Sequence, residues 1–272
     1  MNAEIVAPLL NACVASTAYV KRSVDGTGAT AGFLMGTLIY LAGGPWFWIL
    51  LMLFFVSASA ISRLPGRKKI PGETVPTQLR GSRRDHVQVF ANGAPALIVA
   101  LIYAAMPGIE LGVLFAVAIA SANADTWAGE LGVFSAHPPV LITSGEPVQA
   151  GRSGAISPLG LSAAALGAGI IAVGYGAGHV LVYGLEPAAP AFAVLVGFGG
   201  FVGAVLDSFL GATIQAQYRE EDPEGAFHDT PRTDDRDRKP DRGFRFVTND
   251  IVNLMSGSLA VVIGALALFL LR

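Results

Sequence analysis

Long apolar segments alternate with short polar connections along most of the chain. Eight of them, of about 17–28 residues each, are long enough to cross a hydrocarbon core of roughly 30 Å as α-helices at 1.5 Å per residue. They are predicted at residues 4–20, 27–43, 45–62, 88–106, 110–134, 158–184, 190–217 and 248–271. The pattern therefore predicts an all-α, polytopic membrane protein in which residues 1–272 form a single integral membrane domain.

Composition agrees with a protein whose main solvent is lipid. Hydrophobic residues make up 53% of the chain and charged residues only 14%, whereas a soluble domain carries about a quarter charged residues. The mean hydropathy is +0.56. The first apolar segment has its positive charges, Lys21 and Arg22, after the apolar run, which is the reverse of a secretory signal peptide. We therefore expect this segment to remain as a helix.

The basic residues predict an orientation. When the eight segments are threaded alternately through a membrane, all 18 Lys and Arg residues except Arg272 fall on one side. Because positive charge is retained in the cytoplasm, this side is predicted to be cytoplasmic, with both termini outside. We expect the protein in the cell (inner) membrane of a prokaryote, with its active site facing the cytoplasm.

Two of the predicted cytoplasmic loops differ in character. Residues 63–85 are strongly basic, which suits topology determination and attraction to anionic headgroups, or phosphate binding by Arg83 and Arg84 at the end of the loop. Residues 218–247 carry both signs of charge at high density, and their low hydrophobicity is typical of a solvated linker.

Polar side chains within the apolar segments gather at the predicted cytoplasmic ends. The motif ANADTWAGELG at 122–132 is the most conspicuous, and its DTWAGE resembles DSFLGA at 207–212, so two acids occupy similar depths on two helices of the same direction. An ionised Asp at the centre of a membrane helix costs at least about 2.5–3.5 kcal/mol, so such acids are expected to face a protein interior or a wet cavity. The polar residues at these ends include Asp25, Thr27, Asn92, Asn123, Asp125, Glu130, Asp207, Gln215, Asn249, Asp250 and Asn253.

A shared cation would allow several of these acids to remain ionised close together. Carboxylate, amide and hydroxyl oxygens are hard ligands that suit Mg²⁺, which takes one or two protein carboxylates together with waters and substrate phosphates. The candidate metal ligands are Asp25, Asp125, Asp207 and Asp250. A magnesium-bound phosphate compound that enters from the cytoplasm is expected to complete the site.

Candidate phosphate ligands lie at the same membrane face. The loop GRSGAIS at 151–157 combines a cation and a hydroxyl with flexible backbone N–H groups just before a helix N-terminus, where the helix dipole favours anions. The chain contains no P-loop, dinucleotide-binding, paired-His or GxSxG motif. The candidate nucleotide or phosphate ligands are Thr27, Arg83, Arg84, Asn92, Asn123, Arg152, Ser153, Gln215, Asn249 and Asn253.

Taken together and in order, the motifs resemble the integral membrane family that includes transmembrane protein 19 and the plastid phytyl-phosphate kinase of vitamin E synthesis. The matching motifs are SVDGTGATAG, GGPWFW, FFVSASAISR, RRDHVQVFANG, ANADTWAGELG, GRSGAIS, GFVGAVLDSFLGATIQ and TNDIVN. The chain is also distantly similar to the dolichol and phytol kinases, which use CTP. The sequence departs from the family pattern in two places. The loop before TNDIVN is longer and more charged, and GSRRD stands where Gly-Gly is more usual before the Arg pair. Neither departure touches a proposed ligand.

The resemblance implies a Mg-dependent lipid kinase of the phosphotransferase class. Such an enzyme would move the terminal phosphoryl group of CTP or another nucleoside triphosphate to a membrane prenyl monophosphate and give the diphosphate. Asp125, Asp207 and Glu130 are the candidate catalytic residues, and no nucleic acid is expected as a partner. Glu130 lies about 140° around the helix from Asp125, so we expect it to orient a neighbouring Asn or Arg rather than bind the same ion.

Two alternatives to a kinase remain open at this point. A transporter or lipid flippase would also use intramembrane acids and glycine-broken helices, but its site is expected near the bilayer midplane with access from both sides. A CTP-dependent nucleotidyltransferase acting on a lipid phosphate would use the same ligands and differ only in the phosphorus atom that is attacked. A purely structural protein would leave the cost of the buried acids without an offset.

Overall fold

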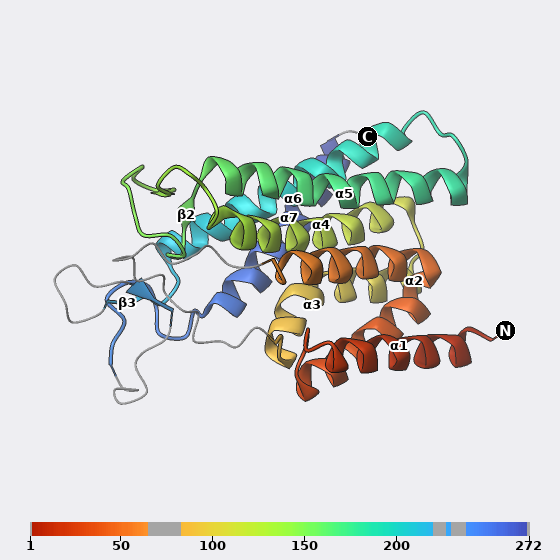
Figure 1. Cartoon of the computed structure of the whole chain (residues 1–272). Helices are drawn as coiled ribbons and strands as arrows, with labels where there is room; N and C mark the ends of the chain where they lie inside the picture. The colour runs from red at the N-terminus through yellow and green to blue at the C-terminus, as the bar shows by residue number, and fades with distance from the viewer. Residues whose placement is uncertain (1, 65–82, 220–226, 230–237, 271–272) are drawn as a thin grey trace.

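The computed structural model describes residues 2–64, 83–219, 227–229 and 238–270, and these residues are mostly helical (Figure 1). Each helix in this part of the chain is long and apolar enough to cross a membrane. The all-α membrane architecture predicted from the sequence is confirmed. The helices are α1 (Ala3–Val20), α2 (Gly26–Ile61), α3 (His86–Ala105), α4 (Ile109–Gly132), α5 (Pro158–Tyr183), α6 (Ala189–Thr213) and α7 (Asn249–Leu270).

Two small antiparallel sheets lie in the connections between helices. One pairs β1 (Val140–Leu141) with β2 (Ala155–Ile156), and the other pairs β3 (Tyr218–Arg219) with β4 (Phe227–His228). Each strand has two residues, so the sheets shape loops and add no layer to the fold.

Helix α2 contributes two membrane crossings. It is interrupted at Gly44, whose positive φ of 77° favours glycine, and Pro45 follows without a backbone N–H. The Arg63 guanidinium, just after the helix, donates to the Ser23 hydroxyl at 2.6 Å, just before it. Because a straight helix of 36 residues would separate its ends by about 54 Å, this contact requires α2 to fold back at the glycine. The two segments of α2 and the six other helices of the described chain match the eight predicted spans.

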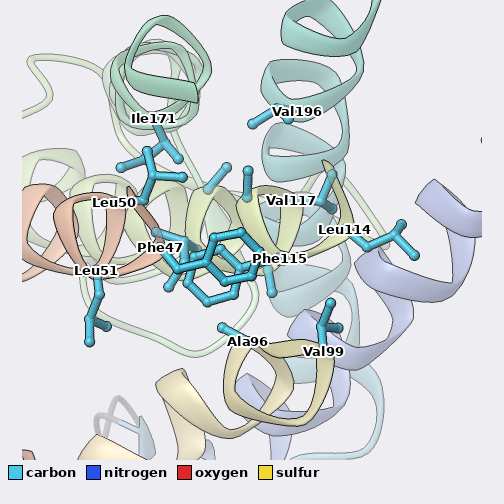
Figure 2. Packing of buried hydrophobic residues seen from close by; sticks show 14 of the residues in the cluster. Phe47, Leu50, Leu51, Ala96, Val99, Leu114, Phe115, Val117, Ile171 and Val196 are labelled. Carbon is cyan, nitrogen blue, oxygen red and sulfur yellow. The ribbon is translucent and has the colours of Figure 1, made fainter. Parts of the chain in front are cut away.

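Helix α4 is surrounded by other helices. Its residues Val113–Ala124 are all buried, and it packs against α2, α3, α5, α6 and α7. Figure 2 shows Phe115 of α4 stacked on Phe47 of α2, with ring centroids 4.1 Å apart. A helix that is apolar on every side belongs in a core, and α4 occupies that position here.

Small residues allow α4 and α6 to approach closely. A Cβ atom at Gly203 of α6 would collide with the Ser121 hydroxyl of α4, and one at Gly200 would collide with Ala120. In membranes such close approach lets backbones gain van der Waals contact that lipid does not offer. The small residues therefore set the spacing between the two helices.

Both termini lie at one end of the bundle, and the connections that contain β2 and β3 lie at the other (Figure 1). We call this second end the loop end and define it by residues 133–157 and the described residues of 214–248. The predicted basic loop at 63–85 and charged loop at 218–247 are described only in part, since residues 65–82, 220–226 and 230–237 lie outside the described chain.

The contact of Gly200 with Ala120 predicts the effect of adding one methyl group. Gly200→Ala should destabilise the protein by about 1–3 kcal/mol, because overpacking forces α4 and α6 apart. Thermal unfolding in detergent, followed by tryptophan fluorescence, measures the change. Gly169→Ala in α5 is the matched control, since a Cβ there meets nothing within 4 Å. Equal melting temperatures for the two variants would contradict this account.

The predicted orientation can be tested with single cysteines in a Cys13→Ser background. Leu185→Cys, between α5 and α6, and Glu146→Cys, in the loop end, place exposed thiols at opposite ends of the bundle. A membrane-impermeant maleimide added to intact cells should label Leu185→Cys and should label Glu146→Cys only after permeabilisation. The opposite pattern would reverse the orientation.

Candidate functional site

The two acids of the repeated motif meet between α4 and α6. The carboxyl groups of Asp125 and Asp207 lie within hydrogen-bonding range of each other, about two turns before the loop end of their helices. Asp207 is buried, and its Oδ2 accepts a hydrogen bond from the Ser256 hydroxyl of α7 at 2.9 Å. Three helices thus converge on what we call the acid pair, Asp125 and Asp207.

The tight contact between α4 and α6 leads directly to the acid pair. Ser121 lies one turn before Asp125, and Gly203 lies one turn before Asp207. Because Gly203 has no side chain, its backbone approaches Ser121, and the two acids of the next turn are held side by side.

Helix α7 adds further polar groups on the loop side of the acid pair. Asp250, Asn253 and Ser256 follow one another at about one-turn spacing, and the side chains of Asp250 and Ser256 are buried. Among the described residues, the buried Oδ1 of Asn253 has no hydrogen-bond donor. An unsatisfied buried acceptor costs about 1–3 kcal/mol, so a donor or a cation bound here would be favourable.

The predicted set of four metal-binding acids requires a correction. In the described part of the chain, no group of three or more His, Cys, Asp or Glu side chains is arranged to hold a metal ion. Asp25 instead caps α2 by accepting hydrogen bonds from the Gly28 N–H at 2.8 Å and the Thr27 hydroxyl at 2.7 Å. These two bonds hold the pKa of the Asp25 carboxyl below its ordinary value.

The remaining donors fit Mg²⁺, which takes only one or two protein carboxylates. The acid pair supplies two carboxyl groups, and Ser256 supplies a hydroxyl beside them. The unsatisfied amide oxygen of Asn253, one turn away, is a further hard donor. The binding of a metal ion here stays a prediction.

Glu130 lies on a different face of α4 from the acid pair, as its position around the helix predicted. It accepts a hydrogen bond from the Ser62 hydroxyl at 2.8 Å. Its charge also acts on the Arg84 guanidinium, where burial lowers the pKa of the arginine and Glu130 opposes that effect. The main chain of Arg84 pairs with Ser23 and Asp25, which ties the start of α3 to the start of α2.

Three of the predicted phosphate ligands form hydrogen bonds within the fold. Asn123 donates to the Gly167 carbonyl at 2.7 Å and accepts from the Ser57 hydroxyl at 3.0 Å, so it joins α4 to α5 and α2. Thr27 belongs to the cap of α2, and Asn92 donates to the carbonyl one turn before it. Of the other candidates, Arg83 is exposed and Asn249 begins α7.

The loop end brings Arg152 and Ser153 to the end of α6. Ser153 accepts a hydrogen bond from Gln215 at 2.9 Å and donates to Asp229 at 2.7 Å. Arg152 donates to Gln217 at 3.3 Å, and its guanidinium lies 4.1 Å from the centre of the Phe227 ring. The structure thus assembles the predicted candidates Arg152, Ser153 and Gln215.

The loop end also contains residues that the sequence motifs did not indicate. Burial lowers the pKa of the Arg152 guanidinium, and the positive charges of Arg242 and Arg219 lower it further, while Glu146 opposes them. We call Arg152, Arg219 and Arg242 the arginine cluster. The positive charges in 218–247 were the available signal, but nothing in that loop indicates which of them return to Arg152.

Comparison with known proteins agrees with this architecture. The model of the integral membrane protein family DUF92 matches residues 9–261. Protein PGR of Arabidopsis thaliana is 30% identical over 235 residues, which cover 78% of this chain and 78% of the plant protein. An uncharacterised membrane protein of Methanocaldococcus jannaschii is 30% identical over 210 residues, with 76% of this chain and 82% of the relative covered.

A third relative comes from a cyanobacterium. An uncharacterised membrane protein of Synechocystis is 26% identical over 218 residues, which cover 78% of this chain and 81% of the relative. No solved structure matches the chain. Because the family model spans most of the sequence, the chain belongs to the DUF92 family of integral membrane proteins.

Proposed function

We propose that the chain is a prenyl (phytyl-type) phosphate kinase. It moves the terminal phosphoryl group of a nucleoside triphosphate, with CTP as the first candidate, to a membrane polyprenyl monophosphate and gives the diphosphate. The observation that carries the proposal is the acid pair, which lies inside a membrane bundle at the same end as the arginine cluster. Two carboxylates beside cationic groups are the usual components of a metal-assisted phosphate site.

The energetic cost of the acid pair supports a ligand-binding role. Two adjacent carboxyl groups within a membrane helix bundle repel each other if both ionise, and each is costly to desolvate. Asp125, Asp207 and Ser256 would hold Mg²⁺, with Asn253 as a further donor. When bound, this ion neutralises the carboxylates and the charge that develops on the phosphate oxygens.

The protein groups then have distinct roles in the transfer. An oxygen of the acceptor phosphate attacks the γ-phosphorus, the bond from that phosphorus to the β-phosphate oxygen breaks, and the nucleoside diphosphate leaves. A phosphate monoester has a second pKa near 6, so the attacking oxygen is largely ionised at neutral pH and needs no strong general base. The arginine cluster binds the triphosphate and offsets its charge, and such positioning accounts for most of the catalysis in phosphoryl transfer.

The depth of the acid pair favours a kinase over a transporter. Both acids lie about two turns from the loop end of their helices, whereas a transporter site is expected near the middle of the bundle. A soluble nucleotide would reach the acid pair from the loop end alone. Transfer of a nucleotidyl group to a lipid phosphate is distinguished from kinase activity by the fate of the phosphorus atoms.

Reconstituted vesicles provide the test of the reaction class. With Mg²⁺, labelled CTP, ATP or GTP, and phytyl, geranylgeranyl or undecaprenyl phosphate, we expect label from the γ-phosphorus to appear in the lipid. Label from the α-phosphorus would instead identify nucleotidyl transfer. If no nucleotide is consumed with any acceptor and the lipid phosphate moves across the membrane, the protein is a flippase.

Replacement of either acid of the pair should greatly slow phosphoryl transfer. Asp125→Asn and Asp207→Asn are expected to lower kcat by about 10²–10³-fold, since each removes a negative charge that would hold the Mg²⁺ ion. Glu4→Gln at the start of α1, at the far end of the bundle, is the matched control and should leave the rate unchanged. Wild-type rates in either Asp variant, with normal thermal unfolding, would remove the acid pair from the mechanism.

A further inference from the structure

A cavity of about 90 Å³ lies between α1, both segments of α2, and α3. We call it the α1–α3 cavity. Apolar and small side chains line most of its length, among them Val14 and Ala18 of α1, Met35 of α2 and Phe54 in the second segment of α2. The cavity thus offers a narrow apolar space inside the bundle.

Polar groups gather at the end of the α1–α3 cavity that is nearest the loop end. They come from Arg84, from Gln88 and Asn92 in the first turns of α3, and from Thr126 of α4. At the far end lies Asn11, which donates a hydrogen bond to Ala7 and accepts one from the Trp48 indole. From Ala18 to Asn11 the cavity follows α1 for about 10 Å.

The guanidinium of Arg84 is the group at the α1–α3 cavity that a bound anion would satisfy. Arg84 is one of the residues that line the α1–α3 cavity, and burial of its guanidinium lowers the pKa of the group. Within the described residues, no hydrogen bond or ion pair reaches this guanidinium, although the charge of Glu130 acts on it. A desolvated guanidinium with five N–H donors is best satisfied by a bidentate anion such as phosphate.

We propose that the α1–α3 cavity binds the first part of the isoprenoid chain of a lipid monophosphate, with the phosphate held by Arg84. The lining supports a ligand with one apolar chain and a charged head, since apolar and small side chains line most of the cavity and Arg84 lies at one end. That this lipid is the acceptor of the phosphoryl group rests on the proposed function above.

The position of α4 relates the cavity to the acid pair. Thr126 lines the cavity, and Asp125 is the preceding residue, about 100° around the same helix. A phosphate bound by Arg84 would therefore lie beside the turn of α4 that carries the acid pair. Glu130, on the following turn, is not among the residues that line the cavity, and its charge acts on Arg84.

Gly32 of α2 allows the cavity to be filled without damage to the fold. It lines the α1–α3 cavity, and a Cβ atom there meets nothing within 4 Å. Gly32→Leu should weaken the binding of labelled geranylgeranyl phosphate to purified protein, without nucleotide, by about tenfold or more. Binding of dimethylallyl phosphate, whose chain is much shorter, should be weakened less. Gly169→Leu in α5, also with open space at its Cβ, is the matched control.

Arg84→Gln tests the phosphate end of the cavity. It should weaken geranylgeranyl phosphate binding by about tenfold or more while leaving the binding of geranylgeraniol, which has no phosphate, unchanged. Lys21→Gln removes one exposed positive charge from the same end of the bundle and should change neither affinity. Inorganic phosphate and the two-chain lipid phosphatidic acid should compete poorly.

Each remaining outcome has a defined meaning. Wild-type affinity in Gly32→Leu, or competition by phosphatidic acid as strong as by geranylgeranyl phosphate, overturns the cavity proposal. If Gly32→Leu unfolds at a lower temperature than wild type, Ala15→Leu on α1 fills the same space and replaces it. If lipid binding depends on Gly32 and Arg84 but the protein consumes no nucleotide, the kinase proposal is refuted and the cavity proposal stands. If both variants keep wild-type turnover and wild-type lipid binding, the cavity proposal is refuted and the kinase proposal stands.

Discussion

The close packing of α4 against α6 is the constraint on which the candidate site depends. Gly203 lets the α6 backbone approach Ser121, and the acids one turn later on each helix, Asp207 and Asp125, are held side by side as a result. A larger residue at the glycine position would separate the helices and the two carboxyl groups together. The packing that a membrane bundle needs for stability and the geometry of the acid pair thus have a common cause.

Helix α4 serves several sites because it is enclosed on all sides. One face presents Asp125 to α6, and another joins Asn123 to α5 and α2. On a third face, Thr126 lines the α1–α3 cavity and the charge of Glu130 acts on Arg84. Lipid cannot satisfy polar groups on such a helix, so each must find a partner in the protein or in a bound ligand. The polar residues of ANADTWAGELG therefore have separate roles.

The spans, the break at Gly44 and the shared depth of Asp125 and Asp207 could be predicted because each is a local property of the chain. The role of Asp25 could not, since an Asp before a helix is equally suited to capping and to metal binding. The surroundings of Arg152 were also beyond prediction, because Gln217 and Phe227 lie more than 60 residues away in a loop that resembles a solvated linker.

The sequence by itself determined the solvent of this protein, the number of its crossings and the depth of each polar residue, because hydropathy and helical rise are read along the chain. Only the tertiary structure decided which polar groups meet, because the rotation of each helix about its axis depends on the shapes of its neighbours. Asp125 and Glu130 illustrate the difference. They share a motif and a helix, yet one faces Asp207 and the other faces Ser62 and Arg84, because α6 packs against one side of α4 and α2 against another.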